Sequence, residues 1–165
     1  YESLAFRDLT MSLASEADVA MKVPRTEALA ALREFRTSVV EGDRGETGGG
    51  ATMFLKYPLS ALLIPEISQV FNTRLVYVLR PVQDIEATRL RRGWSENLGG
   101  KGARRLYGAM FDVLINLSIP TMIIRYPELL ARPMPITRQL AAFSGLQLSD
   151  AEIEAAAGFV RRAGG

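Results

Sequence analysis

The sequence predicts an α/β fold in which a parallel sheet lies between two layers of helices. Three short apolar runs, residues 52–55, 74–79 and 121–124, are typical of buried strands, because each is bounded by polar residues. Segments with helical character separate them. Strands that alternate with helices form parallel sheets covered by helices on both faces, so three layers are expected. Three strands make a thin sheet for this much helix, and a further strand before Tyr1 would complete it.

Apolar residues at helical spacing, with turn residues between the segments, predict the helices. We expect helices over residues 4–19, 25–40, 59–71, 82–92, 103–117, 135–143 and 150–162. Pro65 should kink or split the third of them, because proline cannot continue a helical hydrogen-bond ladder. Two glycine-rich stretches, residues 42–50 and 93–102, are expected to be loops.

The composition limits the chemistry that is available. The 165 residues fit one domain with a core of its own, and the net charge of +2 does not indicate a nucleic-acid or membrane partner. Disulfides and thiolate metal sites are excluded because the chain has no cysteine. It also has no histidine, so catalysis would use carboxylates, Lys, Arg, Tyr or Ser/Thr. With no signal-peptide pattern and no apolar run of membrane-spanning length, a cytoplasmic location is expected.

A cation follows each predicted strand: Lys56, Arg80 and Arg125. The carboxyl ends of parallel strands meet at one edge of the sheet, which is where open α/β sheets bind ligands. Pro81 favours extended backbone at Arg80, and the helix expected after it offers a helix N-terminus to an anion. Each cation alone is equally explained as a strand-end side chain in water. Together the three predict a site for a polyanion.

The stretch from Arg80 to Thr88 combines an apolar strand, an arginine, a nearby proline, Asp84 four residues on and Thr88 eight residues on. This pattern resembles the 3′-phosphate-binding segment of PAPS-dependent sulfotransferases, a P-loop-containing family. The usual proline two residues after the arginine is Val82 here, with Pro81 displaced by one position, and Thr88 replaces the more usual serine.

Other stretches resemble the same family in order and spacing. Lys56-Tyr57-Pro58 is similar to its Lys-x-Pro segment, and residues 124–146 are similar to its closing Arg-Tyr-Glu pattern with a later proline and Leu-Gly-Leu-like end. Tyr1-Glu2-Ser3 is similar to a Tyr-Glu-Asp stretch that follows the P-loop in bacterial members. The glycine-rich loop that holds the phosphosulfate in this family is not found in the sequence.

The resemblance implies a single sulfotransferase-like domain over residues 1–165, with a P-loop NTPase-like fold that lacks its first strand, P-loop and first helix at the N-terminus. PAPS would be the co-substrate and PAP the product, and no metal is required. Arg80 and Thr88 would bind the 3′-phosphate, and Lys56 would neutralise the sulfuryl or leaving-group oxygen. Glu2 is the candidate base for an acceptor hydroxyl or amine, with a solvated surface glutamate as the alternative. We expect the chain alone to have little or no activity.

Two other functions are compatible with the same residues. One is an equally truncated P-loop nucleotide or small-molecule kinase, which would bind ATP with Mg²⁺. The other is a binding or interaction module without catalysis. A missing strand would leave an unpaired sheet edge, and such edges favour pairing with another chain, so a homodimer through this edge is expected. The acceptor is not predicted.

Overall fold

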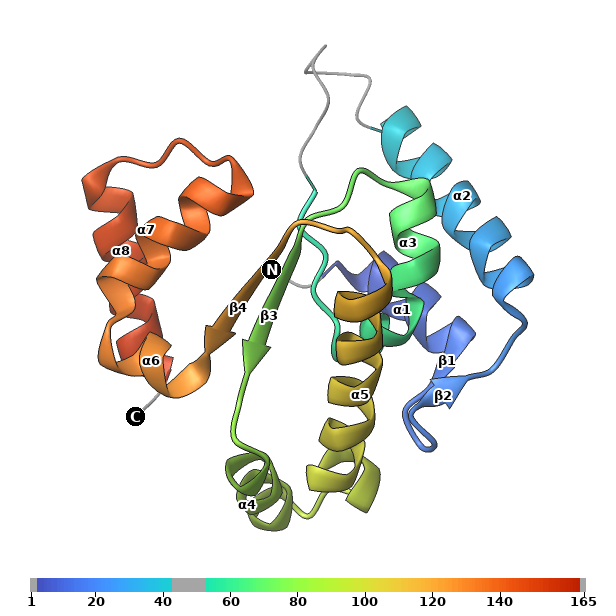
Figure 1. Cartoon of the computed structure of the whole chain (residues 1–165), viewed down its shortest axis with the longest axis horizontal. Coiled ribbons are helices and arrows are strands. Elements are labelled where there is room, and N and C mark those ends of the chain that lie inside the picture. The colour runs from blue at the N-terminus through green and yellow to red at the C-terminus, as the bar shows by residue number, and fades with distance from the viewer. Residues whose placement is uncertain (1–2, 43–52, 164–165) are drawn as a thin grey trace. The chain divides into compact units, whose positions relative to one another are not determined.

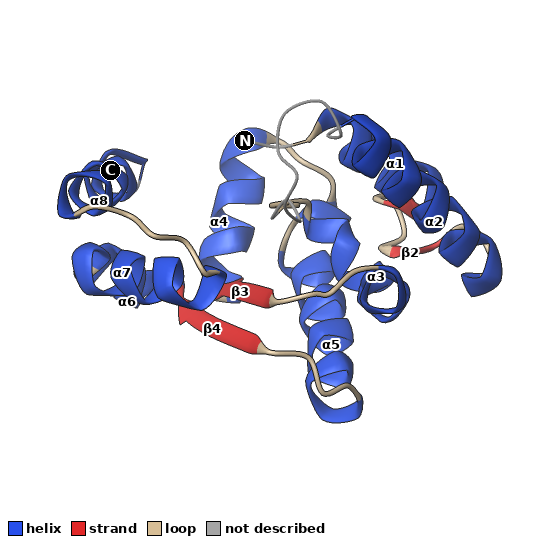
Figure 2. Ribbon diagram, turned by 90° about the horizontal axis from the view of Figure 1, so that it is seen from above, coloured by secondary structure: helices blue, strands red, loops and turns tan. Residues whose placement is uncertain are grey.

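A computed structural model describes residues 3–42 and 53–163 of the chain (Figure 1). Most of the regular structure is helical, and the strands are short (Figure 2). The described residues form two compact units. The first takes the residues up to Thr73 together with Ile85–Ser118, and the second takes Arg74–Asp84 together with the residues from Ile119 onward.

The first unit is built mainly from helices. In chain order its elements are α1 (Leu4–Leu13), β1 (Ala14–Ser15), β2 (Ala20–Met21), α2 (Arg25–Gly42), the 3₁₀ helix η1 (Pro58–Leu63), α3 (Ile64–Val70), the 3₁₀ helix η2 (Glu96–Leu98) and α5 (Gly100–Asn116). Strands β1 and β2 pair antiparallel as a small hairpin. Helix α4 (Val82–Arg92) begins in the second unit and continues into the first.

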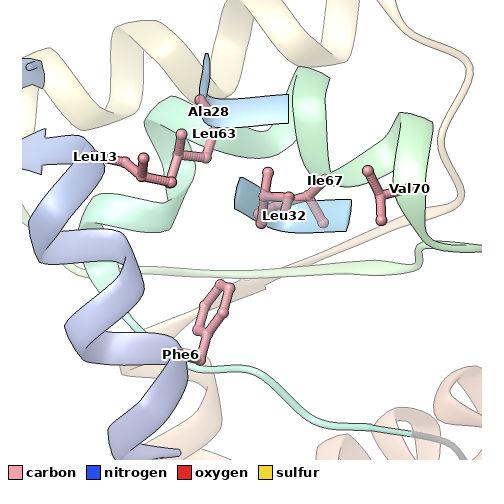
Figure 3. Packing of buried hydrophobic residues seen from close by; sticks show 7 residues of the cluster. All are labelled: Phe6, Leu13, Ala28, Leu32, Leu63, Ile67 and Val70. Atoms are coloured by element: carbon pink, nitrogen blue, oxygen red, sulfur yellow. The ribbon is translucent and has the colours of Figure 1, made fainter. Parts of the chain in front are cut away.

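The core of the first unit lies where α1, α2, η1 and α3 meet (Figure 3). Its buried side chains are Phe6, Leu13, Ala28, Leu32, Leu63, Ile67 and Val70. The Ser3 hydroxyl caps α1 by accepting a hydrogen bond from the Phe6 N–H at 3.3 Å. Beside this core Arg25 Nη1 donates to Oε1 of the buried Glu66 at 2.6 Å, which ties the start of α2 to α3. The apolar faces of these helices therefore cover one another.

The start of α5 is held by a carboxylate of α4. The Gly100 N–H donates to Glu86 Oε2 at 2.8 Å, and Arg89 forms an ion pair with Glu86 at 2.7 Å. The hydrogen bond from Arg89 and the one from the Gly100 N–H lower the pKa of Glu86. Two residues into the helix, Gly102 is buried against the backbone of Asn97 in η2. The glycines of this segment thus allow α5 to begin in close contact with η2 and α4.

The second unit contains a two-stranded parallel sheet and three helices. Strand β3 (Leu75–Leu79) pairs with β4 (Thr121–Arg125), and Leu75 lies opposite Thr121 and Leu79 opposite Arg125. Helices α6 (Tyr126–Ala131), α7 (Pro133–Ser144) and α8 (Asp150–Ala163) follow. Helix α7 ends at Gly145, whose φ of 75° is the left-handed conformation that glycine adopts without strain. Arg74 Nη1 donates to the Phe143 carbonyl at 2.6 Å and joins the start of β3 to α7.

Within the described residues, β3 and β4 pair only with each other, so each strand has an outer edge. The Leu75 N–H donates to the Pro120 carbonyl at 2.9 Å. Because alternate residues of a parallel strand bond to the same neighbour, the N–H and C=O groups of Val76 and Val78 point away from β4. Their side chains are 37% and 46% exposed. This edge of β3 therefore offers backbone groups beside apolar side chains.

The structure confirms the α/β class, the parallel pairing of residues 74–79 with 121–124, and helices close to the predicted bounds over α2, α4, α5, α7 and α8. Pro65 lies in the first turn of α3, and the predicted helix over residues 59–71 is split into η1 and α3. A short helix, α6, follows β4 directly and was not predicted. No helix in the described part of the chain is long and apolar enough to cross a membrane.

Three predictions are wrong. The first helix ends at Leu13 instead of at residue 19, because Ala14 and Ser15 pair with β2. The strand expected over residues 52–55 is not seen in its described residues 53–55; Leu55, and Tyr57 after it, pack instead against the core of the first unit. The sheet of the described residues therefore has two parallel strands where three were expected, and the three-layer architecture is not seen. The glycine-rich stretch 42–50 lies outside the described residues except for Gly42, which ends α2.

Candidate functional site

The clearest meeting of functional side chains lies at the carboxyl ends of the two parallel strands. Arg80 follows β3 and Tyr126 follows β4, and the pairing of Leu79 with Arg125 brings these two residues to neighbouring positions one step further on. Residues at paired positions of parallel strands point to the same face of a sheet. The guanidinium carbon of Arg80 accordingly lies over the Tyr126 ring, 5.4 Å from its centroid. The backbone register thus places a cation against an aromatic face.

Arg125 does not share this position. It lies one residue earlier in the register than Tyr126, and successive residues of a strand point to opposite faces. Its side chain is 71% exposed and its Nη1 lies 3.1 Å from Glu128 Oε1, an ion pair within the first turn of α6. The sequence predicted that Arg80 and Arg125 would serve one polyanion. The register separates them, and Arg125 has a carboxylate partner of its own.

Thr88 and Asp84 lie one helical turn apart on α4, as the spacing predicts. The helix begins at Val82, so Arg80 itself is not part of it, and the Asp84 N–H donates to the Pro81 carbonyl at 3.0 Å in the turn that starts the helix. Arg80 belongs to the second unit and Thr88 to the first. The binding of one phosphate by Arg80 and Thr88 together therefore stays a prediction from the sequence pattern.

Lys56 and Glu2 complete the set of predicted site residues. Lys56 is exposed, lies in the first unit, and follows a segment without regular structure. The inference that it stands at a strand end is therefore wrong. Glu2 lies outside the described residues. The roles assigned to these two side chains stay predictions.

Tyr77 is the tyrosine at the centre of β3, and its side chain is buried. Burial raises the pKa of its hydroxyl, because the phenolate would lose its hydration. In a chain without histidine, tyrosine is one of the few groups that can act as a base. The raised pKa keeps Tyr77 neutral, which makes it unsuitable for that role at neutral pH.

One surface pocket, of about 230 Å³, lies in the first unit between η1, α3 and α5. Its lining is mostly apolar, with Arg25, Asp112 and Asn116 as polar members. Arg25 is engaged by Glu66, and the Asn116 amide donates to the Asp112 carbonyl at 2.8 Å. The pocket is smaller than the roughly 300–1,000 Å³ of typical small-molecule sites. It offers no cluster of groups suited to catalysis.

The other glycine-rich stretch, residues 93–102, contains η2 and the first residues of α5 in addition to loop. The Glu86 carboxylate already occupies the N–H of Gly100, so this helix start is capped from within the chain. Among the described residues no three His, Cys, Asp or Glu side chains gather as a metal site. The expectation that no metal is required stays a prediction.

The chain matches no protein-family model, no curated protein and no solved structure. The resemblance to sulfotransferases therefore depends on the motifs alone. Tyr126, which lies against Arg80, was not among the site residues predicted from the sequence. The signal was present: Arg80-Pro81 and Tyr126-Pro127 both follow apolar strands, and aligned strand ends place the two side chains together.

Proposed function

We propose that the chain is part of a PAPS-dependent sulfotransferase and that Arg80 and Thr88 bind the 3′-phosphate of the nucleotide. The observation that supports this most directly is the place of Arg80. It follows the parallel strand β3 and precedes Pro81 and helix α4, in the order that the family motif requires. A cation at the carboxyl end of a parallel strand, next to a helix start, suits a phosphate.

The chemistry of the two side chains fits this role. A guanidinium presents a planar fork of N–H donors that matches two phosphate oxygens, and a threonine hydroxyl can donate a further hydrogen bond. Sulfuryl transfer between oxygens resembles phosphoryl transfer, in which positioning and cationic stabilisation supply most of the catalysis. Lys56 is proposed to neutralise charge on the sulfuryl or leaving-group oxygen, and Glu2 to accept the proton of the acceptor.

The proposed fold is the P-loop NTPase-like one, in which β3 and β4 would be two strands of a larger parallel sheet. No glycine-rich loop of the phosphosulfate-binding type is recognised in the sequence. The proposal therefore concerns the 3′-phosphate half of the cofactor site. We expect the 165-residue chain to bind PAP and to transfer little or no sulfuryl group by itself.

Calorimetric titration of the chain with PAP and with 5′-AMP tests the proposal, because the two ligands differ by the 3′-phosphate. PAP should bind more tightly than 5′-AMP. Arg80→Ala should weaken PAP binding about 10- to 100-fold, since a hydrogen bond to a charged group contributes about 1.5–3 kcal/mol. The matched control is Arg91→Ala, which removes the same charge from an exposed position on α4. Equal affinity for the two ligands, or equal losses for the two variants, would refute the assignment.

Thr88 is tested by a matched pair of substitutions. Thr88→Ser keeps the hydroxyl and should bind PAP within about twofold of the wild type. Thr88→Val removes it and should bind PAP about 10- to 100-fold more weakly, because a hydrogen bond to a charged phosphate contributes about 1.5–3 kcal/mol. Equal binding by the two variants would remove Thr88 from the site. Tight binding of ATP that requires Mg²⁺, without a preference for the 3′-phosphate, would favour the kinase alternative instead.

A further inference from the structure

We propose that Tyr126 is a positioning residue for Arg80: its ring supports one face of the guanidinium and fixes the direction in which the cation meets a phosphate. This inference rests on the proposed function and deepens it, because it adds a residue to the 3′-phosphate site. It comes from the contact at the strand ends, where the Arg80 guanidinium carbon lies 5.4 Å from the centre of the Tyr126 ring.

The backbone fixes the ring before any ligand is present. Arg125, the residue before Tyr126, is the last of β4 and has extended dihedral angles, and Tyr126 is the first residue of α6 with Pro127 in the first turn. Pro127 fixes its own φ in the first turn of α6, which restricts the chain at this turn. The register of β3 and β4 then sets the separation of the two side chains.

The contact with the Tyr126 ring involves the face of the guanidinium and not its N–H edge. A guanidinium stacks on an aromatic ring through its flat face, whereas its N–H donors point outward in its plane. The ring and an oxyanion therefore use different parts of the same group. The Nε atom of Arg80 is buried, so the stem of the side chain is enclosed as well. A long side chain that is already oriented loses less conformational freedom when the phosphate binds.

Tyr126→Phe keeps the aromatic face, and Tyr126→Leu removes it while keeping an apolar side chain of moderate size. The first unit offers a matched control in Trp94, because the guanidinium carbon of Arg92 lies 4.8 Å from the centroid of its ring. Trp94→Leu removes an arginine–aromatic contact of the same kind from residues that the proposed phosphate site does not use. The three variants therefore distinguish the loss of the Tyr126 ring from the loss of an arginine–aromatic contact elsewhere in the protein.

Two measurements on the full chain test the proposal. The first is the ¹⁵N–¹H spectrum of the arginine Nε–H groups, in which the Arg80 signal is assigned by its loss in Arg80→Ala. Tyr126→Leu should shift this signal by removing the ring current, and Tyr126→Phe should leave it near its wild-type position. The second is calorimetric titration with PAP. Tyr126→Leu should bind about three- to tenfold more weakly, with Tyr126→Phe and Trp94→Leu within about twofold of the wild type.

The outcomes distinguish this inference from the proposed function. If PAP binds in an Arg80-dependent manner but Tyr126→Leu binds it as well as the wild type, only the positioning role is overturned. An Arg80 signal that Tyr126→Leu does not shift also overturns it, whatever the affinity for PAP. If the wild type does not bind PAP, the proposed function fails and the positioning role fails with it. The positioning role is supported if the affinity for PAP falls in Tyr126→Leu but not in Tyr126→Phe. Tyr126→Leu should then cause no further fall in a protein that already carries Arg80→Ala.

Discussion

The same substitution at two glycines of α5 should change stability in opposite directions. A Cβ atom built on Gly102 would lie 2.8 Å from the carbonyl carbon of Asn97 and closer still to its oxygen, and 3.3 Å from Val19 Cγ2. A Cβ atom on Gly108 would meet no atom within 4 Å. Both glycines lie within the helix, so the exchange for alanine removes backbone freedom from the unfolded chain at either position.

The magnitudes follow from these contacts. Gly108→Ala should stabilise the protein by about 0.5–1 kcal/mol, the usual difference between the two residues inside a helix. Gly102→Ala gains the same stabilisation of alanine over glycine in a helix, but its Cβ atom must displace the backbone of Asn97. Overpacking of this sort costs about 1–3 kcal/mol or more. The Asn97 side chain donates to the Ala17 carbonyl of the hairpin turn, so the backbone is anchored where it would have to move. Because the stabilisation by alanine is common to both positions, we expect the two variants to differ by the overpacking cost, about 1–3 kcal/mol.

Urea unfolding followed by circular dichroism measures this difference. In thermal unfolding the same difference corresponds to melting temperatures about 2–12 °C apart, since 1 kcal/mol shifts a domain of this size by about 2–4 °C. Gly102→Ser should be as harmful as Gly102→Ala, because both introduce a Cβ atom. If Gly102→Ala is as stable as Gly108→Ala, α5 does not begin against η2 in the way described.

Three further stability measurements test other parts of the fold. Leu32→Ala, at a fully buried core position, should cost about 2–5 kcal/mol, whereas Leu90→Ala at a 65% exposed site should change stability by less than about 0.5 kcal/mol. Because the folded pKa of Glu86 is lowered, its ionised form stabilises the fold at neutral pH, and this contribution is lost as the pH falls below about 4.5. The stability difference between wild type and Glu86→Gln should therefore shrink on acidification; a difference that is constant with pH would contradict the capping role. Gly145→Ala should cost about 1–2 kcal/mol for its left-handed φ, and no loss would show that α7 ends differently.

Sequence patterns predicted the elements that carry strong local signals. The run Leu75–Leu79 is long enough, and apolar enough, to be recognised as a strand, and the charges of α4 follow the helix dipole from Asp84 to Arg92. Short apolar runs are ambiguous, and Met53–Leu55 shows why. Leu55 packs against the core while Phe54 is 55% exposed, an alternation that also occurs in an extended segment without a strand partner.

Only the parts of the candidate site that depend on neighbouring residues in the sequence could be predicted. Arg80 could be identified from the apolar strand before it and the proline after it, and the strand and the following helix lie where they were expected. Its relation to Tyr126 depends on the register of two strands that are separated by about forty residues, and single-sequence patterns do not fix a register. The same register places Arg125 on the other face. The grouping of Lys56, Arg80 and Arg125 at one polyanion site therefore stays a prediction from the sequence.

The outer edge of β3 also bears on the homodimer expected from the sequence. The residues from Arg74 to Arg80 read Arg-Leu-Val-Tyr-Val-Leu-Arg, which is the same in both directions. Antiparallel pairing of two copies about a two-fold axis at Tyr77 would match Val76 with Val78 but would set Arg74 opposite Arg80 of the second copy. Like charges in such pairs repel, and salt screens the repulsion. Self-association through this edge should therefore strengthen as salt is added, whereas phosphate binding at Arg80 should weaken. Sedimentation would measure the association and calorimetry the phosphate binding over the same series of salt concentrations.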